Sequence, residues 1–84
     1  MATKTLFVGN LPWSVNDDNL EKIFEGFGKV HSARVITDRE TGRSRGFGFV
    51  EMDADVADTC MQEVNGMEID SRPLRVNEAN QRGS

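Results

Sequence analysis

The sequence predicts an α+β domain in which two helices back a four-stranded antiparallel sheet, in the chain order βαββαβ. Four segments alternate between apolar and polar residues or are rich in β-branched residues, as strands are, and two others repeat apolar residues at helical spacing. Glycine, asparagine and proline separate these segments. A chain of 84 residues has room for one such domain, expected over residues 4–79 with flexible ends at 1–3 and 80–84.

The first strand is predicted over residues 4–9, where Phe7 occupies the face opposite to its apolar neighbours. A helix over residues 16–27 follows, because Asn16 can cap it and its first turn is acidic. We expect Gly28 to end this helix. Its apolar residues recur at i, i+3, i+4 and i+7 and are Leu20, Ile23, Phe24 and Phe27.

The second strand is predicted over residues 30–37, which are rich in β-branched side chains. Arg34 would face outward if a bulge shifts the strand's register. In that case the core positions would be Val30, Ala33 and Val35. The polar segment 38–44 is longer than a tight turn requires, and we expect it to be a mobile loop that carries Arg43.

The third strand, residues 45–52, has an unusual distribution of side chains. One face would carry Arg45, Phe47, Phe49 and Glu51, and the other Gly46, Gly48, Val50 and Met52. A face that combines aromatic rings with charges would be costly to bury, because an unpaired charge loses its hydration. Exposed rings beside a guanidinium suit flat, anionic ligands such as unpaired nucleic-acid bases.

The second helix is predicted to begin at a cap formed by Asp53 or Asp55 and to stop at Asn65-Gly66. Its apolar stripe comprises Val56, Ala57, Cys60, Met61 and Val64. A short edge piece could follow over residues 67–69, and residues 72–76 complete the sheet with Arg75 facing outward.

The charge distribution allows an anionic ligand although the chain is acidic, with a net charge of -4. The two helical segments, 16–27 and 53–64, carry -3 and -4, which leaves +3 for the rest of the chain. Five arginines lie in predicted strands or the loop between them: Arg34, Arg39, Arg43, Arg45 and Arg75. The sheet side is therefore predicted to be basic and the helical side acidic.

Composition excludes several classes of function. No apolar run is long enough to span a bilayer, and no apolar leader follows Met1, so we expect neither a membrane protein nor a secreted one. With one cysteine and one histidine, we expect no disulfide, metal site or cofactor. A reducing compartment is expected: the cytoplasm or, in a eukaryote, the nucleus or an organelle.

The aromatic strands and their order resemble the RNA recognition motif. The octapeptide of residues 45–52 and the hexapeptide of residues 6–11 match that family's two signature segments. The chain looks most like single-motif, glycine-rich RNA-binding proteins of bacteria or plants. The resemblance implies a ferredoxin-like βαββαβ sandwich that binds single-stranded RNA, or single-stranded DNA, as a monomer without catalysis. Met52 departs from the family's aromatic preference, but by alternation it faces the core.

The resemblance also implies roles for particular residues. Phe7 and Phe49 match the rings on which adjacent bases stack, and Phe47 matches the ring that contacts the sugars. Arg45 matches the phosphate-pairing cation. Further RNA contacts are expected from five residues: Arg34 on the second strand, Arg43 in the loop, and Arg75, Asn77 and Asn80 on or after the last strand.

Two other classes of function compete with RNA binding. A hydrolase of the same layout, resembling acylphosphatases, would need an anion-cradling loop with an arginine near the first strand, and residues 9–12 supply neither the arginine nor a run of glycines. A protein-interaction module remains an alternative, although displayed aromatics favour the RNA-binding interpretation.

Three residues outside the aromatic face have ordinary structural interpretations. Trp13 could extend the stacking platform, but we expect it to pack over a helix or a sheet edge, as most tryptophans do. His31 is expected to be a polar strand residue, and Cys60 a small core residue rather than a nucleophile.

Overall fold

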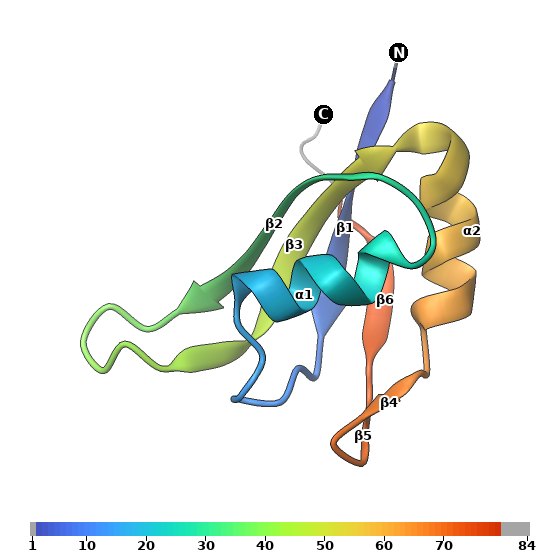
Figure 1. The fold of residues 1–84 in the computed structure, drawn as a ribbon. Helices are drawn as coiled ribbons and strands as arrows, with labels where there is room; N and C mark the ends of the chain where they lie inside the picture. The colour runs from blue at the N-terminus through green and yellow to red at the C-terminus, as the bar shows by residue number, and fades with distance from the viewer. Residues whose placement is uncertain (1, 80–84) are drawn as a thin grey trace.

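The computed structural model describes residues 2–79 and contains the predicted antiparallel sheet with both helices on one face (Figure 1). The strands of this sheet lie in the order β2-β3-β1-β6, and every neighbouring pair is antiparallel. Their bounds are β1 Thr3–Gly9, β2 Val30–Thr37, β3 Ser44–Asp53 and β6 Arg75–Glu78. The helices are α1 Asp17–Glu25 and α2 Ala54–Val64. The βαββαβ prediction is confirmed.

A second, two-stranded sheet interrupts the segment between α2 and β6. It is a short hairpin of β4 Glu68–Ile69 and β5 Arg72–Pro73, paired antiparallel. Its turn residues, Asp70 and Ser71, both have positive φ, at 52° and 68°. The sequence predicted an edge piece near residue 69 but placed residues 72–76 in one strand. The structure divides that segment at Leu74, whose side chain is buried in the core.

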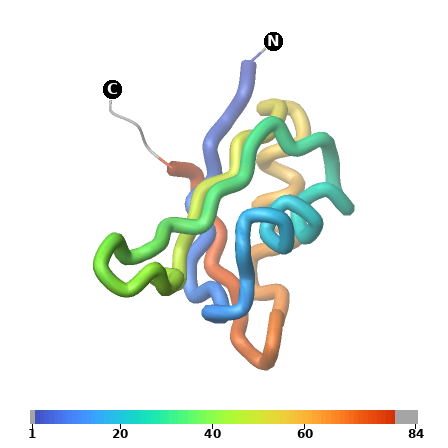
Figure 2. The backbone as a smooth tube through the Cα atoms, turned by 60° about the vertical axis from the view of Figure 1, so that its left-hand side comes forward, coloured from blue at the N-terminus to red at the C-terminus, as the bar shows by residue number. Residues whose placement is uncertain are grey.

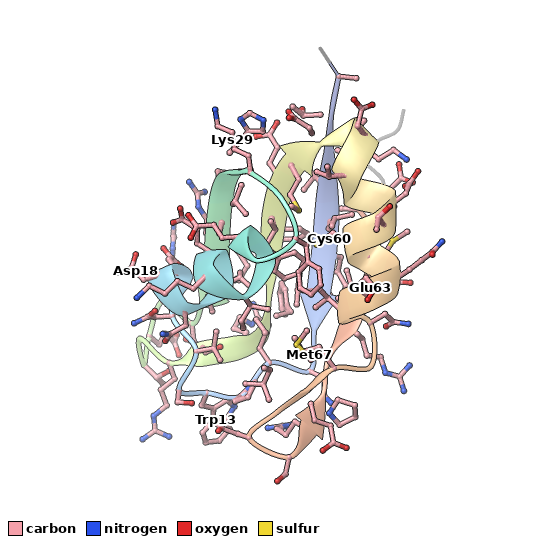
Figure 3. All side chains as sticks on the ribbon, turned by 45° about the vertical axis from the view of Figure 1, so that its right-hand side comes forward. Trp13, Asp18, Lys29, Cys60, Glu63 and Met67 are labelled. Atoms are coloured by element: carbon pink, nitrogen blue, oxygen red, sulfur yellow. The ribbon has the colours of Figure 1, made fainter. Side chains whose placement is uncertain are left out.

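The core lies between the sheet and the helices (Figure 3). On β1 and β3, the inward residues are fully buried, as alternation predicted: Leu6, Val8, Val50 and Met52. From the helices, the buried side chains are Leu20, Phe24, Ala57, Cys60 and Val64. These apolar side chains form one core cluster on the helical side of the sheet. Neither helix covers the opposite face of the sheet.

Helix α1 begins where the sequence predicted and ends earlier. The side chain of Asn16 accepts a hydrogen bond from the Asn19 amide at 2.8 Å, and the Asn19 side chain accepts one from the Asn16 amide at 3.2 Å, forming a capping box. The C-cap is Gly26, with a right-handed φ of -63°, so the prediction that Gly28 ends the helix is wrong. Gly28 instead lies against α2, where an added Cβ would come 2.9 Å from Val56 Cγ2.

Strand β2 contains the bulge on which its predicted register depended. The pairing with β3 shifts between Val30 and Ser32, which places Arg34 opposite Phe49 and leaves it exposed. Val35 is buried, and Val30 and Ala33 pack partly buried against the core. The loop between β2 and β3 projects from one end of the sheet, away from the helices (Figure 2). Asp38 organises this loop, because its carboxylate accepts a hydrogen bond from the Glu40 amide at 2.8 Å.

The two glycines of β3 are required by the backbone around them. Gly46 has a φ of +87°, in the left-handed region that other residues avoid. At Gly48, an added Cβ would lie 2.4 Å from the carbonyl oxygen of Arg34 on β2. No side chain can be accommodated there without separating β2 from β3.

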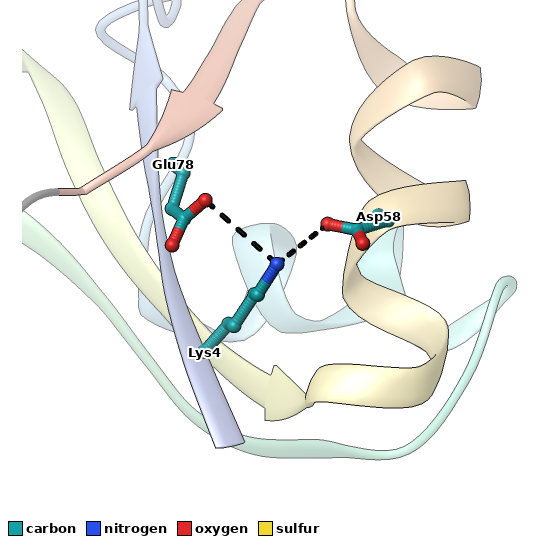
Figure 4. A network of polar contacts seen from close by, with 3 residues as sticks. All are labelled: Lys4, Asp58 and Glu78. Carbon is teal, nitrogen blue, oxygen red and sulfur yellow. Dashed lines mark hydrogen bonds and ion pairs between the residues drawn. The ribbon is translucent and has the colours of Figure 1, made fainter. Parts of the chain in front are cut away.

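The start of α2 differs from the expected side-chain cap. Asp53 occupies the N-cap position, but its side chain makes no capping hydrogen bond, and neither it nor Asp55 serves as the cap that we predicted. The Asp53 carboxylate instead contacts His31 Nε2 of β2 at 2.6 Å. On the helical side of the sheet, Lys4 of β1 joins α2 to β6 through ion pairs with Asp58 at 2.9 Å and Glu78 at 3.7 Å (Figure 4). These carboxylates raise the pKa of Lys4, chiefly through the hydrogen bond to Asp58.

Candidate nucleic-acid interface

Three phenylalanines form a cluster on the face of the sheet opposite to the helices. Phe7 of β1 pairs directly with Phe49 of β3, and Phe47 lies two residues earlier on β3. The ring centroids are 5.7 Å apart for Phe7–Phe47, 5.9 Å for Phe7–Phe49 and 6.2 Å for Phe47–Phe49. All three side chains are half-buried, so each ring keeps part of its surface in solvent. We call this set the aromatic cluster.

The cluster is held in place by strand alternation. Because Leu6, Val8, Val50 and Met52 point into the core with no exposed surface, their strand neighbours must face the other way. A slip of one residue would bury the charges of β3 and expose its valine. The predicted face assignment of the three rings is therefore confirmed.

Cationic and amide side chains surround the aromatic cluster. Arg34 is opposite Phe49 across the β2–β3 pair, while Asn77 and Arg75 of β6 are opposite Phe7 and Gly9. Val76 is buried, so its neighbours on β6 point to the same open face as the rings. Arg45, at the start of β3, is exposed.

None of these arginines is neutralised within residues 2–79. The ion pairs in that part of the chain involve Lys4 and His31 only. In particular, Arg45 forms no ion pair with Glu51, which lies on the same strand. The guanidinium groups are thus free to meet an anionic ligand.

A groove of about 390 Å³ lies beside Phe49, on the β2 side of the aromatic cluster. It is lined by Thr5, Ser32, Arg34, Ile36, Phe49 and Glu51. The sequence placed Glu51 on the aromatic face but gave it no role, and it did not single out Thr5, Ser32 or Ile36. This groove could not be found from β3 alone, because its β2 wall depends on the bulge between Val30 and Ser32.

One further predicted site residue, Arg43, lies in a loop and not on the strands that carry the aromatic cluster. Arg43 is exposed at the end of the β2–β3 loop, where its carbonyl oxygen accepts a hydrogen bond from the Asp38 amide at 2.7 Å. The predicted closure of this loop over the strand stays a prediction. Asn80 lies outside the described residues.

Trp13 is the main correction to the predicted surface. We expected it to pack on a helix or sheet edge, but its side chain is 70% exposed in the loop between β1 and α1 (Figure 3). It borders a pocket of about 480 Å³ beside the start of α1, where Asp17 and Asp18 also lie. The start of α1 is joined to β2 by a different contact, in which the Asp17 carboxylate accepts a hydrogen bond from the Val35 amide at 2.7 Å.

Possible metal ligands and the lone cysteine are the remaining chemically reactive groups in the part of the chain that the structure describes. No group of three His, Cys, Asp or Glu side chains is placed to hold a metal ion there. Cys60 is fully buried, and this burial raises the pKa of its thiol to about 11, which keeps it protonated and unreactive at neutral pH. Neither α1 nor α2 is long and apolar enough to cross a membrane.

Comparison with known proteins identifies the family. A family model described as the RNA recognition motif matches residues 6–75. The chain belongs to the RNA recognition motif family. Its two signature segments lie on the adjacent central strands of the motif's sheet: residues 6–11 cover the end of β1 and the two residues after it, and residues 45–52 lie within β3.

Similar proteins carry the same motif within longer chains. This RNA recognition motif is 49% identical over 79 residues to glycine-rich RNA-binding protein 8 of Arabidopsis thaliana, covering 93% of the chain and 47% of that protein. It is 50% identical over 85 residues to the mitochondrial glycine-rich RNA-binding protein 4 of the same plant, covering 100% and 62%. The chain thus spans about half the length of these two relatives.

A solved structure confirms the ferredoxin-like fold. The crystal structure of RNA binding protein PG1 superimposes with a TM-score of 0.88 at 48% identity, covering 96% of this chain and 99% of that one.

Proposed function

We propose that this RNA recognition motif binds single-stranded RNA across its open sheet face. Phe7 and Phe49 stack on successive bases, Phe47 contacts the sugars between them, and Arg45 pairs with a phosphate. The observation that carries this proposal is the aromatic cluster, in which three rings with centroids 5.7 to 6.2 Å apart stay half-exposed on a face without helices. Soluble domains rarely leave three adjacent rings in water unless a ligand covers them.

The flanking polar residues extend the proposed site. Arg34, Arg75 and Asn77 share the aromatic face, which supports the proposal that they meet phosphates or base edges. Arg43, from the adjacent loop, and Asn80, just after β6 in the sequence, complete the set of residues that we propose to contact RNA.

The proposed ligand is single-stranded nucleic acid, bound by a monomer without a metal or cofactor. RNA is the principal ligand, and single-stranded DNA would fit the same rings because every base has an aromatic face. The family is one of binding domains, so we assign no catalysis. We further propose a role in post-transcriptional regulation or RNA chaperoning, in the cytoplasm or, in a eukaryote, in the nucleus or an organelle. The names of the relatives support RNA binding and, for one of them, a mitochondrial location.

The expected affinity is modest and depends on salt. Stacking contributes about 1 to 3 kcal/mol per base, so two bases and a few phosphates give a Kd near the micromolar range, about -8 kcal/mol. Each phosphate neutralised on a single strand should lower the log-log slope of affinity against salt by about 0.7. A flat response to salt would contradict the role given to the arginines.

Fluorescence anisotropy with a labelled, mixed-sequence single-stranded RNA tests the proposal, using the Phe49→Ala variant. Phe49 is half-buried on the open face, so its loss should weaken binding by about tenfold or more while the domain stays folded by circular dichroism. Phe27→Ala is the control, because this ring is 36% exposed and lies just after α1, outside the aromatic cluster. It should leave the affinity unchanged.

An amide NMR titration with the same RNA locates the interface. Shifts should concentrate on β1, β3 and β6, around the aromatic cluster. If these amides do not shift at a large excess of RNA, the sheet is not the RNA site, and the alternative of a protein-interaction module would replace this proposal.

A further inference from the structure

The groove beside Phe49 contains two opposite charges that do not neutralise each other. Arg34 of β2 is directly across from Phe49, and Glu51 lies two residues further along β3, across from Ser32. Diagonal neighbours of this kind have Cα atoms about 7 to 8 Å apart. No ion pair forms between them, although both line the groove of about 390 Å³. A donor and an acceptor therefore face the same open space.

The carboxylate of Glu51 is held in a defined position. Thr3 of β1 donates a hydrogen bond from Oγ1 to Glu51 Oε2 at 2.8 Å. Thr5, which is directly opposite Glu51 in the β1–β3 pair, forms part of the same wall. Because no cation among residues 2–79 pairs with this carboxylate, its remaining acceptor sites point to solvent or to a ligand.

A carboxylate on this face acts against general phosphate binding. It repels the RNA backbone, and its own hydration is lost when a base covers the groove. This penalty is offset only if the ligand supplies hydrogen-bond donors to the carboxylate. Glu51 therefore favours a base that presents donors, whereas Phe49 accepts any base by stacking.

Among the four RNA bases, guanine matches this pair of charges best. Its N1–H and N2–H groups are adjacent donors on one edge, so they can donate together to a single carboxylate. Its O6 and N7 atoms are acceptors for a guanidinium. Uracil offers a carboxylate only one ring N–H, and adenine and cytosine offer only an exocyclic amino group.

We propose, on the basis of the RNA-binding function above, that the groove selects guanine. The ring of the base rests on Phe49, Glu51 accepts hydrogen bonds from N1–H and N2–H, and Arg34 donates to the acceptor edge or to the adjoining phosphate. Glu51 is then the residue that determines specificity, and Thr3 is a positioning residue that orients the carboxylate.

The test measures the Kd of labelled hexanucleotides by fluorescence anisotropy. The probes are hexauridine, a set of hexamers with one guanosine at each position, and the best of these with inosine in place of guanosine. A bidentate contact discriminates by about 1 to 3 kcal/mol, so the best guanosine hexamer should bind about 5- to 150-fold more tightly than hexauridine. Inosine lacks the N2 amino group and should lose most of this advantage.

The Glu51→Gln variant assigns the preference to the carboxylate. It should bind the guanosine hexamer no more tightly than hexauridine, while its affinity for hexauridine is unchanged or slightly higher because a negative charge has been removed. Glu25→Gln is the matched control, because Glu25 is an exposed residue at the end of α1 and should leave the guanine preference intact. The inosine comparison needs no variant and tests the proposal even if Glu51→Gln fails to fold.

Several results would overturn the proposal. In the first, the wild type binds the guanosine hexamers and hexauridine with equal affinity. In the second, the Glu51→Gln variant keeps the preference for guanosine. In the third, that variant loses affinity equally for all probes. Failure of the proposed function itself would look different. In that case no hexamer would bind, and both proposals would fall together.

Discussion

Strand β2 passes close to Gly48 of β3, and this contact provides a sharp test of the fold. A Cβ added there would lie 2.4 Å from the carbonyl oxygen of Arg34 and 3.1 Å from the Cα of Val35. Both are backbone atoms of β2, so no rotamer change can relieve the contact. The substitution Gly48→Ala must therefore push β2 away from β3.

The size of the effect follows from this geometry. Overpacking a core typically costs about 1 to 3 kcal/mol, and a contact with immobile backbone belongs at the upper end of that range, about 3 kcal/mol. For a domain of this size each kcal/mol lowers Tm by about 4 to 8 °C, so Gly48→Ala should lower Tm by about 12 to 24 °C. That cost is a large fraction of the roughly 4 to 13 kcal/mol expected for the whole domain.

Circular dichroism, recorded during thermal and urea unfolding, measures this loss of stability. Gly26→Ala is the control, because Gly26 has a right-handed φ of -63° and an added Cβ would come no closer than 3.9 Å to the Ile23 carbonyl oxygen. It should be neutral or should stabilise the domain by up to about 1 kcal/mol. If Gly48→Ala melted within a few degrees of the wild type, the approach of β2 to β3 described here would be wrong.

Three further predictions concern the helices and their contacts with the sheet. Phe24→Ala removes a ring with no exposed surface. Urea unfolding should show that the free energy of unfolding falls by about 3 to 5 kcal/mol. A native-like urea midpoint would mean that the assignment of core and open face is inverted. Asn16→Ala deletes the capping box of α1 and should cost about 1 kcal/mol by the same method, whereas an unchanged midpoint would mean that the cap contributes nothing. Burial raises the pKa of Cys60 from 9.0 to about 11, so the folded state holds this proton more tightly than the unfolded state. The resulting stability is complete below pH 9.0 and is lost as the pH rises through about 11, a total decrease of about 3 kcal/mol. Urea midpoints at pH 8 and pH 11 should show most of that decrease in the wild type and a smaller one in Cys60→Ala.

The sequence predicted the arrangement that matters most for function. Alternation alone assigned Phe7, Phe47 and Phe49 to the open face, and the structure confirms this because a strand has a side-chain period of two. A core of Leu6, Val8, Val50 and Met52 requires that result. The capping box at Asn16 was also predictable in part, since capping depends on residues only three positions apart.

The errors concern choices that local sequence leaves open. Asp53 stands at the N-cap of α2, but its carboxylate contacts His31, which is 22 residues away in the chain. Gly28 could have ended α1, yet the helix stops at Gly26 and leaves Gly28 to make room for Val56. In each case the observed contact is with a residue distant in sequence, which local sequence reasoning does not reveal.

The sequence by itself determined the order of the elements, the two faces of the sheet and the family signature, because each depends on a local period or a contiguous motif. Only the tertiary structure decided the exposure of Trp13, the bulge in β2 and the groove shared by Arg34 and Glu51. The groove needs β1, β2 and β3 in a fixed mutual register, and that register is set by contacts between strands. No period within one strand can specify which residue of the next strand it will face.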